Sequence, residues 1–128
     1  MAEALNGFAD LTVRMSALMK AAATGMSVLS EGPAGMQMNA PIANPMHPKQ
    51  PLWFGGVRLG KAYVSYHLMP VYTHPSLAAK ISPALTKRMQ GKACFNFKAV
   101  DEALFEELAA LTMEAARLYA TPWEMPGR

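Results

Sequence analysis

Apolar residues recur at steps of three and four positions near both ends of the chain, which is the spacing of one face of an amphipathic helix. In the first helix, which Gly25 ends, these residues are Leu5, Phe8, Leu11, Met15, Leu18, Met19 and Ala22. In the second they are Leu104, Leu108, Leu111, Ala115 and Leu118. Asp101 and Glu102 open the second helix with negative charge, Arg117 lies near its carbonyl end, and Pro122 bars its continuation. We therefore expect two amphipathic helices and an irregular tail over residues 121–128.

Between the helices, apolar residues form short runs separated by glycine and proline, which predicts strands. Residues 26–30 and 36–41 predict a hairpin around a loop at residues 31–35. Residues 41–51 hold four of the ten prolines. Because proline has no backbone N–H to donate, we expect this segment to be an irregular surface loop. A last strand over residues 93–98 alternates Phe95 and Phe97 with Cys94, Asn96 and Lys98.

Residues 52–57 and 61–69 predict a second hairpin with a tight turn at Leu59-Gly60, where glycine would supply a positive φ. Pairing Arg58 with Lys61 gives a register that sorts the side chains onto two faces. One face carries Trp53, Val57, Ala62, Val64, Tyr66 and Leu68, and the other carries Leu52, Phe54, Tyr63, Ser65 and His67. A bulge at Gly55-Gly56 would shift the first strand's half of this assignment. These glycines also favour the close approach of another group, such as the ring of Tyr63.

Ser82 and Pro83 are typical of a helix start, because serine caps free amide groups and proline at the first helical position loses no bonded donor. We expect this helix to end at Gly91. Hairpins imply antiparallel pairing, and two amphipathic helices need one sheet face to cover. The sequence thus predicts a single α+β domain over residues 1–128. It is a two-layer sandwich, with an antiparallel sheet of about five strands covered on one face by the N- and C-terminal helices.

Composition narrows the class of protein. The 128 residues are 52% hydrophobic and 16% charged, which argues against an intrinsically disordered chain. A single Cys excludes an internal disulfide and fits a reducing compartment. With no targeting segment and no apolar run of the roughly 20 residues that span a bilayer, we expect a cytoplasmic protein with no membrane partner. The net charge of +3 is small for nucleic-acid binding, and no nucleic-acid module signature is present.

Polar side chains are expected on the open face of the sheet if the helices cover the face with Val64, Tyr66, Phe95 and Phe97. Donors and acceptors beside aromatic surface are the mixture of a small-molecule site. Basic residues near the Ser82 helix start would hold a phosphate or carboxylate, and they are Lys80, Lys87, Arg88, Lys92 and Lys98. The alternative for both groups is an ordinary solvated surface. The candidate ligand-binding residues are Tyr63, Ser65, His67, Lys92, Cys94 and Asn96.

The sequence offers little for catalysis. Cys94 with His67 or His74 would form a nucleophile and base, but a cysteine next to Phe95 in a strand is more typical of packing. The chain has no HExxH, P-loop, nucleotide-binding glycine fingerprint or GxSxG motif. We therefore expect a binding protein rather than an enzyme, and the residues themselves indicate no cofactor.

Two stretches carry a resemblance to a known family. Residues 51–72, PLWFGGVRLGKAYVSYHLMPVY, and residues 81–98, ISPALTKRMQGKACFNFK, resemble the bacterial YdhG-like family of small domains. The family is largely uncharacterised, and its fold is described as related to frataxin. Some members are labelled intracellular iron chaperones. The resemblance therefore implies a frataxin-like fold and a non-enzymatic iron-binding function with acidic surface ligands.

The acidic residues for such a function lie on the C-terminal helix. Ferrous iron outside a cage prefers oxygen and imidazole ligands. Glu102 and Glu106 are one turn apart, and with Glu107 they are the candidate iron ligands; the alternative is a charged first turn and a solvated helix face. A third hypothesis is a homo-oligomer or protein-interaction module that uses exposed aromatic surface, with Trp53, Phe54 and Trp123 as candidates.

Overall fold

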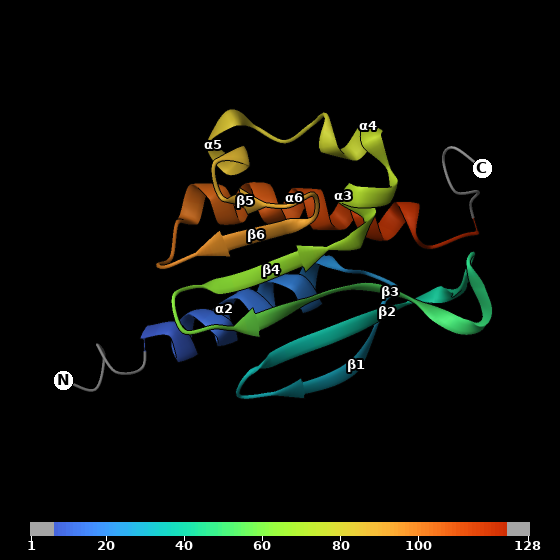
Figure 1. Ribbon diagram of the computed structural model, residues 1–128, viewed down its shortest axis with the longest axis horizontal. Helices are drawn as coiled ribbons and strands as arrows, with labels where there is room; N and C mark the ends of the chain where they lie inside the picture. Colours follow the sequence, from blue (N-terminus) through green and yellow to red (C-terminus); the bar gives the residue numbers. More distant parts are fainter. Residues whose placement is uncertain (1–6, 123–128) are drawn as a thin grey trace.

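Two long helices, α2 (Gly7–Ala22) and α6 (Glu102–Leu118), lie against one face of an antiparallel sheet (Figure 1). The computed structural model describes residues 7–122. Its strands are β1 (Ser27–Gly32), β2 (Gly35–Asn44), β3 (His47–Leu59), β4 (Val64–Leu68), β5 (Met89–Gln90) and β6 (Cys94–Phe97). They lie in the order β1-β2-β3-β4-β6-β5, and every neighbouring pair is antiparallel. The predicted α+β sandwich is confirmed, with the two-residue β5 as an additional edge strand.

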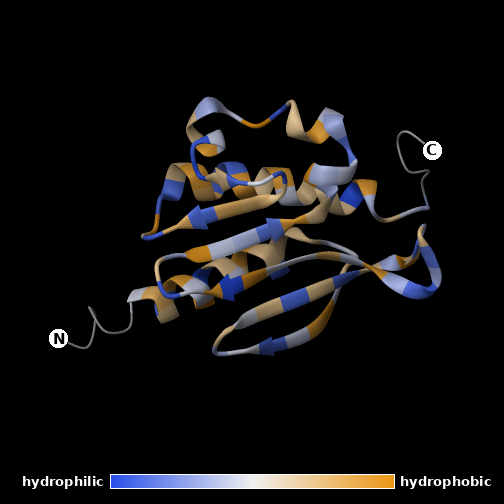
Figure 2. Ribbon diagram, viewed as in Figure 1, coloured by the Kyte–Doolittle hydropathy of each residue, from blue (hydrophilic) through white to orange (hydrophobic). Residues whose placement is uncertain are grey.

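The hydrophobic core lies between the sheet and these two helices. Apolar and polar residues alternate along β4 and β6 (Figure 2), so one set of side chains points towards the helices and the other points away. The predicted covered face is confirmed, because Tyr66, Phe95 and Phe97 are at most 2% exposed. Met15 and Met19 of α2 are fully buried, as expected for residues that pack the helix.

The start of α6 and the end of α2 follow the signals in the sequence. The carboxylate of Asp101 accepts a hydrogen bond of 3.2 Å from the amide of Leu104 and so caps α6. Beyond α2, Gly25 has a φ of +87°, a conformation that glycine adopts without strain. The buried stripe of α6 is wider than predicted and also includes Phe105, Thr112 and Ala116.

Within residues 7–122, no helix has the length and apolar character needed to cross a membrane.

The segment at residues 41–51 is not the irregular loop that we expected. Strands β2 and β3 continue into it and form a projecting hairpin (Figure 1), in which Asn44 lies opposite His47 and Ala43 opposite Pro51. The extended conformation suits the fixed φ of proline, and the register shifts here let other prolines fall outside the paired positions. Asn44 closes the tip, because its side-chain oxygen accepts a hydrogen bond from the amide of Met46.

The second hairpin has a different register from the predicted one. Val57 lies opposite Tyr66 rather than Ala62, and residues 60–63 connect the strands. The turn does not use a positive φ at Gly60. Instead, the Gly60 amide donates to the carbonyl of Tyr63, and a Cβ at Gly60 would lie 2.7 Å from that oxygen. The displacement is an even number of residues, so the predicted faces of β4 are correct despite the wrong register.

A bulge in β3 reverses the predicted faces of its first half. Met38 lies opposite Gly55 and the next residue, Asn39, lies opposite Trp53, so Phe54 is the extra residue. Leu52 and Phe54 are therefore buried in the core, and Trp53 lies on the open face. The sequence predicted that a bulge at Gly55-Gly56 would reverse these faces. The observed bulge has this effect and lies one residue earlier, at Phe54.

The two glycines of β3 are required by neighbouring backbone, not by the ring of Tyr63 as we expected. A Cβ at Gly55 would lie 2.3 Å from the carbonyl oxygen of His67 on β4. A Cβ at Gly56 would lie 2.5 Å from the carbonyl oxygen of Met36 on β2. Real Cβ atoms do not approach other atoms this closely, so these positions have room only for glycine.

The connection from β4 to β6 contains three short helices, α3 (Met69–Thr73), α4 (Pro75–Ala78) and α5 (Pro83–Thr86). Ser82 caps α5 as predicted, and its hydroxyl accepts a hydrogen bond from the amide of Leu85. The helix does not continue to Gly91 as expected. The backbone beyond it pairs with β6 instead: the carbonyl of Arg88 accepts from the amide of Asn96, and β5 follows directly.

Candidate functional site

The open face of the sheet carries two rows of side chains that the strand register places side by side. In one row, Arg58 of β3 lies opposite Ser65 of β4, which lies opposite Asn96 of β6. In the next row, His67 of β4 lies opposite Cys94 of β6, which lies opposite Gln90 of β5. The structure therefore brings together five of the predicted ligand-binding residues, with Tyr63 at the end of β4 included.

A hydrogen-bond network connects these residues, and Asn96 is its centre. The Asn96 side-chain oxygen accepts from the hydroxyl of Ser65 at 2.8 Å and from the thiol of Cys94 at 3.3 Å. The Asn96 amide donates to the side-chain oxygen of Gln90 at 2.8 Å, and the hydroxyl of Tyr63 donates to the same oxygen at 3.2 Å. The network therefore fixes these side chains in a preformed arrangement.

His67 and Cys94 are in contact, but their pKa values do not suit a nucleophile and base. The ring nitrogen Nε2 of His67 lies 3.6 Å from the Cys94 sulfur. Burial, and then the charge of Arg58, lower the pKa of His67 below its ordinary value. Burial raises the pKa of the Cys94 thiol despite a hydrogen bond with Ser65. Both groups are therefore neutral near pH 7, whereas a reactive cysteine needs a lowered pKa.

Trp53 extends this face, although the alternation of residues in the sequence predicted it on the other side. Its indole N–H donates a hydrogen bond of 2.6 Å to the side-chain oxygen of Gln37. Its ring lies 6.0 Å from the ring of His67. Gly56, which lies opposite both Gln37 and His67, contributes no side chain, and the side chain of Gln37 lies close over it.

Two hollows lie on either side of Tyr63. The turn hollow, of about 360 Å³, is lined by Arg58, Gly60, Lys61, Ala62, Tyr63 and Ser65. The β5 hollow, of about 340 Å³, has a lining that includes Tyr63, Lys87, Arg88, Gln90, Asn96 and Lys98. Each hollow thus combines basic side chains with members of the hydrogen-bond network, and neither is lined by a carboxylate. Arg58, Lys61 and Gln90 could not be selected from the sequence pattern, because only the observed strand register shows which residues lie beside them.

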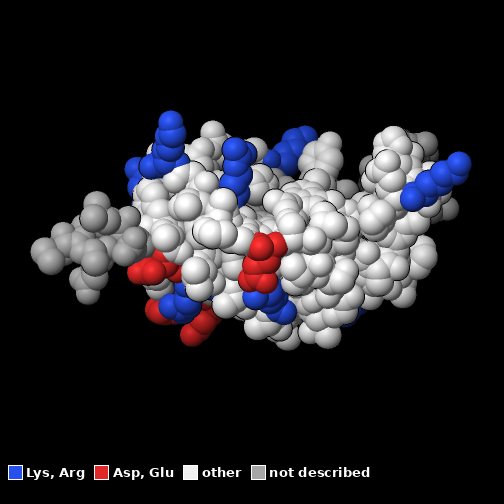
Figure 3. All heavy atoms as spheres, turned by 90° about the horizontal axis from the view of Figure 1, so that it is seen from below, with Lys and Arg blue, Asp and Glu red and all other residues white. Residues whose placement is uncertain are grey.

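Charge is separated across the molecule. The ion pairs within residues 7–122 engage the basic residues Arg14, Lys20, Lys80 and Arg117, and none engages a basic residue of the two hollows. Most acidic residues of that part lie on α2, on α6 or at the cap of α6. In Figure 3, basic side chains stand alone along the upper side of the view, which is the open face of the sheet, and acidic side chains lie lower. The open face is therefore positively charged without local neutralisation.

The other predicted anion-binding groups are engaged elsewhere. The ammonium of Lys92 lies over the ring of Tyr72, 5.7 Å from its centre, and Lys92 lines neither hollow. Lys80 lies 3.9 Å from a carboxylate oxygen of Glu114. At the start of α5, the Glu107 carboxylate accepts hydrogen bonds from the amide and the hydroxyl of Ser82, at 2.8 and 2.6 Å. The anion at this helix start is therefore a side chain of the protein itself.

The candidate iron ligands on α6 have separate partners. Glu102 forms an ion pair of 2.5 Å with Arg14 of α2, whereas Glu107 binds Ser82 near α5. Glu106 is exposed on the same helix. Across residues 7–122, no three His, Cys, Asp or Glu side chains come together as a potential metal site. The iron-binding hypothesis stays a prediction, and the geometry adds nothing in its favour.

The aromatic residues proposed for self-association differ in their burial. Phe54 is fully buried in the core, so its selection as an exposed residue was wrong. Trp53 is only half-buried but belongs to the polar face. Trp123 lies outside the described residues. Self-association through Trp53 or Trp123 stays a prediction.

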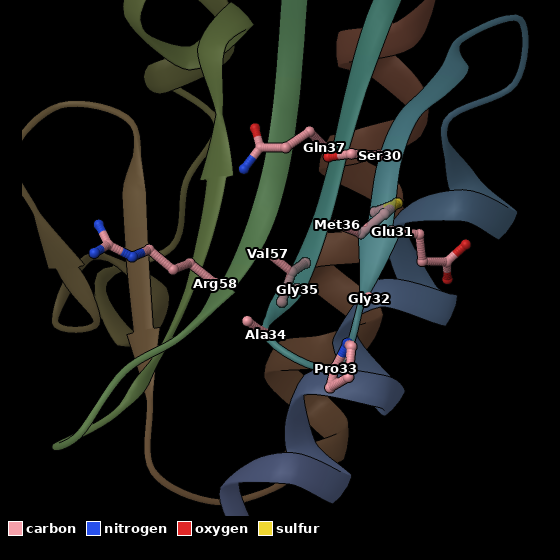
Figure 4. A pocket seen from close by; sticks show the side chains of 10 residues that line it. All are labelled: Ser30, Glu31, Gly32, Pro33, Ala34, Gly35, Met36, Gln37, Val57 and Arg58. Carbon is pink, nitrogen blue, oxygen red and sulfur yellow. The ribbon is translucent and has the colours of Figure 1, made fainter.

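A larger hollow, of about 450 Å³, lies beside the turn between β1 and β2, but it is a poor candidate for ligand binding. Its lining consists of residues 30–37, which include the turn itself, together with Val57 and Arg58 of β3 (Figure 4). The carboxylate of Glu31 pairs with Lys20 at 2.6 Å. Figure 4 shows the Arg58 side chain pointing away from Glu31 and the turn, on the other side of β3. Arg58 therefore lines both this hollow and the turn hollow, with its charged end directed away from the turn between β1 and β2.

Comparisons with protein-family models, curated proteins and solved structures found no match for this chain. The relationship to the YdhG-like family and the frataxin-related fold therefore stay predictions from sequence.

Proposed function

We propose that this protein is a non-enzymatic binding domain that holds a small anionic molecule on the open face of its sheet. The observation that carries the proposal is the set of basic residues around Tyr63, which have no carboxylate partner within residues 7–122. These residues are Arg58, Lys61, Lys87, Arg88 and Lys98. Neighbouring like charges repel each other, so a bound anion relieves this repulsion and also gains charge-assisted hydrogen bonds.

The polar network supports the same function by fixing the floor of the site. Ser65 lines the turn hollow and Asn96 lines the β5 hollow, and their hydrogen bond ties two central strands of the sheet. A ligand that meets an already ordered surface loses less free energy to the ordering of side chains. The neutral His67 and Cys94 beside this floor add donors and acceptors, and their pKa shifts favour binding over nucleophilic chemistry.

Titration with inorganic phosphate at low ionic strength, followed by backbone amide NMR shifts, tests the proposal. We expect saturable shifts centred on Ser65, Asn96 and the residues around Tyr63, and weaker binding as salt is added. Lys61→Ser or Lys87→Ser should each weaken binding of a ligand that contacts them by roughly two- to fivefold, as expected for exposed charge pairs. Lys49→Ser is the matched control, because Lys49 is a basic residue on the projecting hairpin.

The proposal fails if phosphate gives no saturable shifts. It also fails if Lys49→Ser weakens binding as much as substitutions in the hollows, because the effect would then reflect only the net charge of +3.

A further inference from the structure

We infer that the ligand carries two anionic groups joined by a short linker, one for the turn hollow and one for the β5 hollow. This inference rests on the function proposed above and specifies the class of ligand. Its basis is that the basic side chains form two separate sets. Arg58 and Lys61 line only the turn hollow of the two, while Lys87, Arg88 and Lys98 line only the β5 hollow.

Tyr63 separates the two sets and is held in place. It is the one residue that lines both hollows, and its hydroxyl donates to the side-chain oxygen of Gln90. Gln90 is itself held by the amide of Asn96. An anion bound in one hollow is thus separated from the basic side chains of the other hollow. The charges of that second hollow then remain unneutralised.

The two hollows nevertheless share a floor. Ser65 belongs to the turn hollow and Asn96 to the β5 hollow, and their side chains are hydrogen-bonded at 2.8 Å. The residues lie directly opposite each other in β4 and β6, so the hollows are neighbours on one continuous surface. A short linker beside Tyr63 can therefore connect groups seated in both.

Each hollow is large enough for an anionic group. Because a water molecule occupies roughly 30 Å³ in the liquid, hollows of about 360 and 340 Å³ have room for a phosphate or carboxylate with water around it. Phosphates and carboxylates both accept hydrogen bonds from Arg and Lys. The shared chemistry is therefore a pair of linked anions, and the experiment distinguishes the two kinds.

Linking two groups makes the second contact intramolecular, which raises affinity without any new type of contact. We expect tripolyphosphate to bind at least about tenfold more tightly than inorganic phosphate at matched ionic strength. The carboxylate arm compares citrate with acetate. The comparison that shows the larger gain in affinity identifies the anion as a phosphate or a carboxylate. A gain in affinity in either comparison supports the inference.

Two double variants separate linked binding from a simple effect of ligand charge. Arg58→Gln/Lys61→Ser removes the cations of the turn hollow, and Lys87→Ser/Lys98→Ser removes two from the β5 hollow. We expect each variant to lower the affinity for the tighter linked anion by about tenfold, towards that of its single-group counterpart. All the substituted side chains are exposed, and circular dichroism and thermal melts of each variant verify that the fold is retained.

The inference is overturned if only one of the two double variants weakens the linked anion, or if neither linked anion gains over its single-group counterpart. In both cases phosphate still binds and the proposed function stands. If no anion binds to the unmodified protein, the proposed function and this inference both fail.

Discussion

The hydroxyl of Tyr66 on β4 donates a hydrogen bond of 2.6 Å to Oγ1 of Thr112 on α6, within the core between sheet and helices. The direction follows from the second bond of Thr112, whose hydroxyl proton is already donated to the carbonyl of Leu108 at 2.7 Å. Burial raises the pKa of Tyr66, so it remains a neutral donor. This bond ties the strand that carries Ser65 and His67 to the helix layer beneath it.

The two ends of this bond should differ in their contribution to stability. Tyr66→Phe leaves Thr112 with its bond to Leu108, so we expect a loss of about 1 kcal/mol in the free energy of unfolding. Thr112→Val leaves the buried Tyr66 hydroxyl without this acceptor, and we expect a larger loss of about 1–3 kcal/mol. Urea unfolding measures both. Thr86→Val is the control, because the exposed Thr86 makes the same kind of bond to the carbonyl of Ser82. Equal losses for Tyr66→Phe and Thr112→Val would contradict the assigned direction.

Gly55→Ala should destabilise the sheet strongly. The added Cβ would meet the carbonyl oxygen of His67 at 2.3 Å, and the pairing of β3 with β2 and β4 limits relaxation of the backbone. We expect a loss of about 3 kcal/mol or more in the free energy of unfolding. Gly32→Ala, where a Cβ meets nothing within 4 Å, should change stability by less than about 0.5 kcal/mol. Similar unfolding midpoints for the two variants would argue against the close approach of β3 and β4.

Ser82 should influence both stability and anion binding. Its hydroxyl caps α5 and, with its amide, binds the Glu107 carboxylate, which ties α5 to α6. Loss of a cap typically costs about 0.5–2 kcal/mol, and we expect Ser82→Ala to fall in this range by urea unfolding. Because Lys87 and Arg88 follow α5 directly, the variant should also weaken phosphate binding in the β5 hollow. Unchanged stability in Ser82→Ala would show that the contacts with Glu107 do not hold α5 in place.

The stability of the protein should fall as the pH drops from about 7.5 to 5.5, because two histidines have pKa values below the ordinary value of about 6.5. The lowered pKa of His67 means that the unfolded chain takes up a proton more readily than the folded one. Stability is thus greatest above the unfolded pKa and is lost as the pH falls towards the folded pKa. Burial also lowers the pKa of His74. The lowered carboxyl pKa values of Glu102 and Glu114 act below this range.

His67→Gln tests the contribution of that histidine. The midpoint of urea unfolding should fall less between pH 7.5 and 5.5 in the variant than in the unmodified protein. Of the two histidines, only His74 then still contributes to the loss of stability. An identical fall in both proteins would mean that His67 has its ordinary pKa in the folded state.

The layered fold could be predicted from sequence because its signals are local. Asp101 caps α6, Ser82 caps α5, and the alternation of Phe95 and Phe97 correctly identifies the buried face of β6. The α5 helix was predicted too long, because nothing in residues 87–91 shows that their backbone pairs with β6. The prolines at residues 41–51 were misread, because an extended hairpin with register shifts can accommodate them.

The candidate site was only partly predictable, because it depends on strand register. Ser65, His67, Cys94 and Asn96 were selected correctly as neighbours, since alternation alone places them on the open face. Arg58 was missed, because its position opposite Ser65 follows from a longer turn than the sequence suggested. Lys92 was selected for its place in the chain, but its contact with Tyr72 takes it away from the hollows. The bulge at Phe54 inserts a single residue into β3, and this insertion determines the face on which Trp53 lies.

The separation of charge between the two layers gives the molecule an electric dipole moment that points across its thickness. The potential outside the open face is then positive, and it extends over about one Debye length, roughly 10 Å at 0.1 M salt. If the face around Tyr63 binds anions as proposed, we expect this potential to draw them towards it and to raise their rate of association. We expect the same dipole to orient the molecule near a negatively charged surface, with the sheet facing that surface and the helices behind.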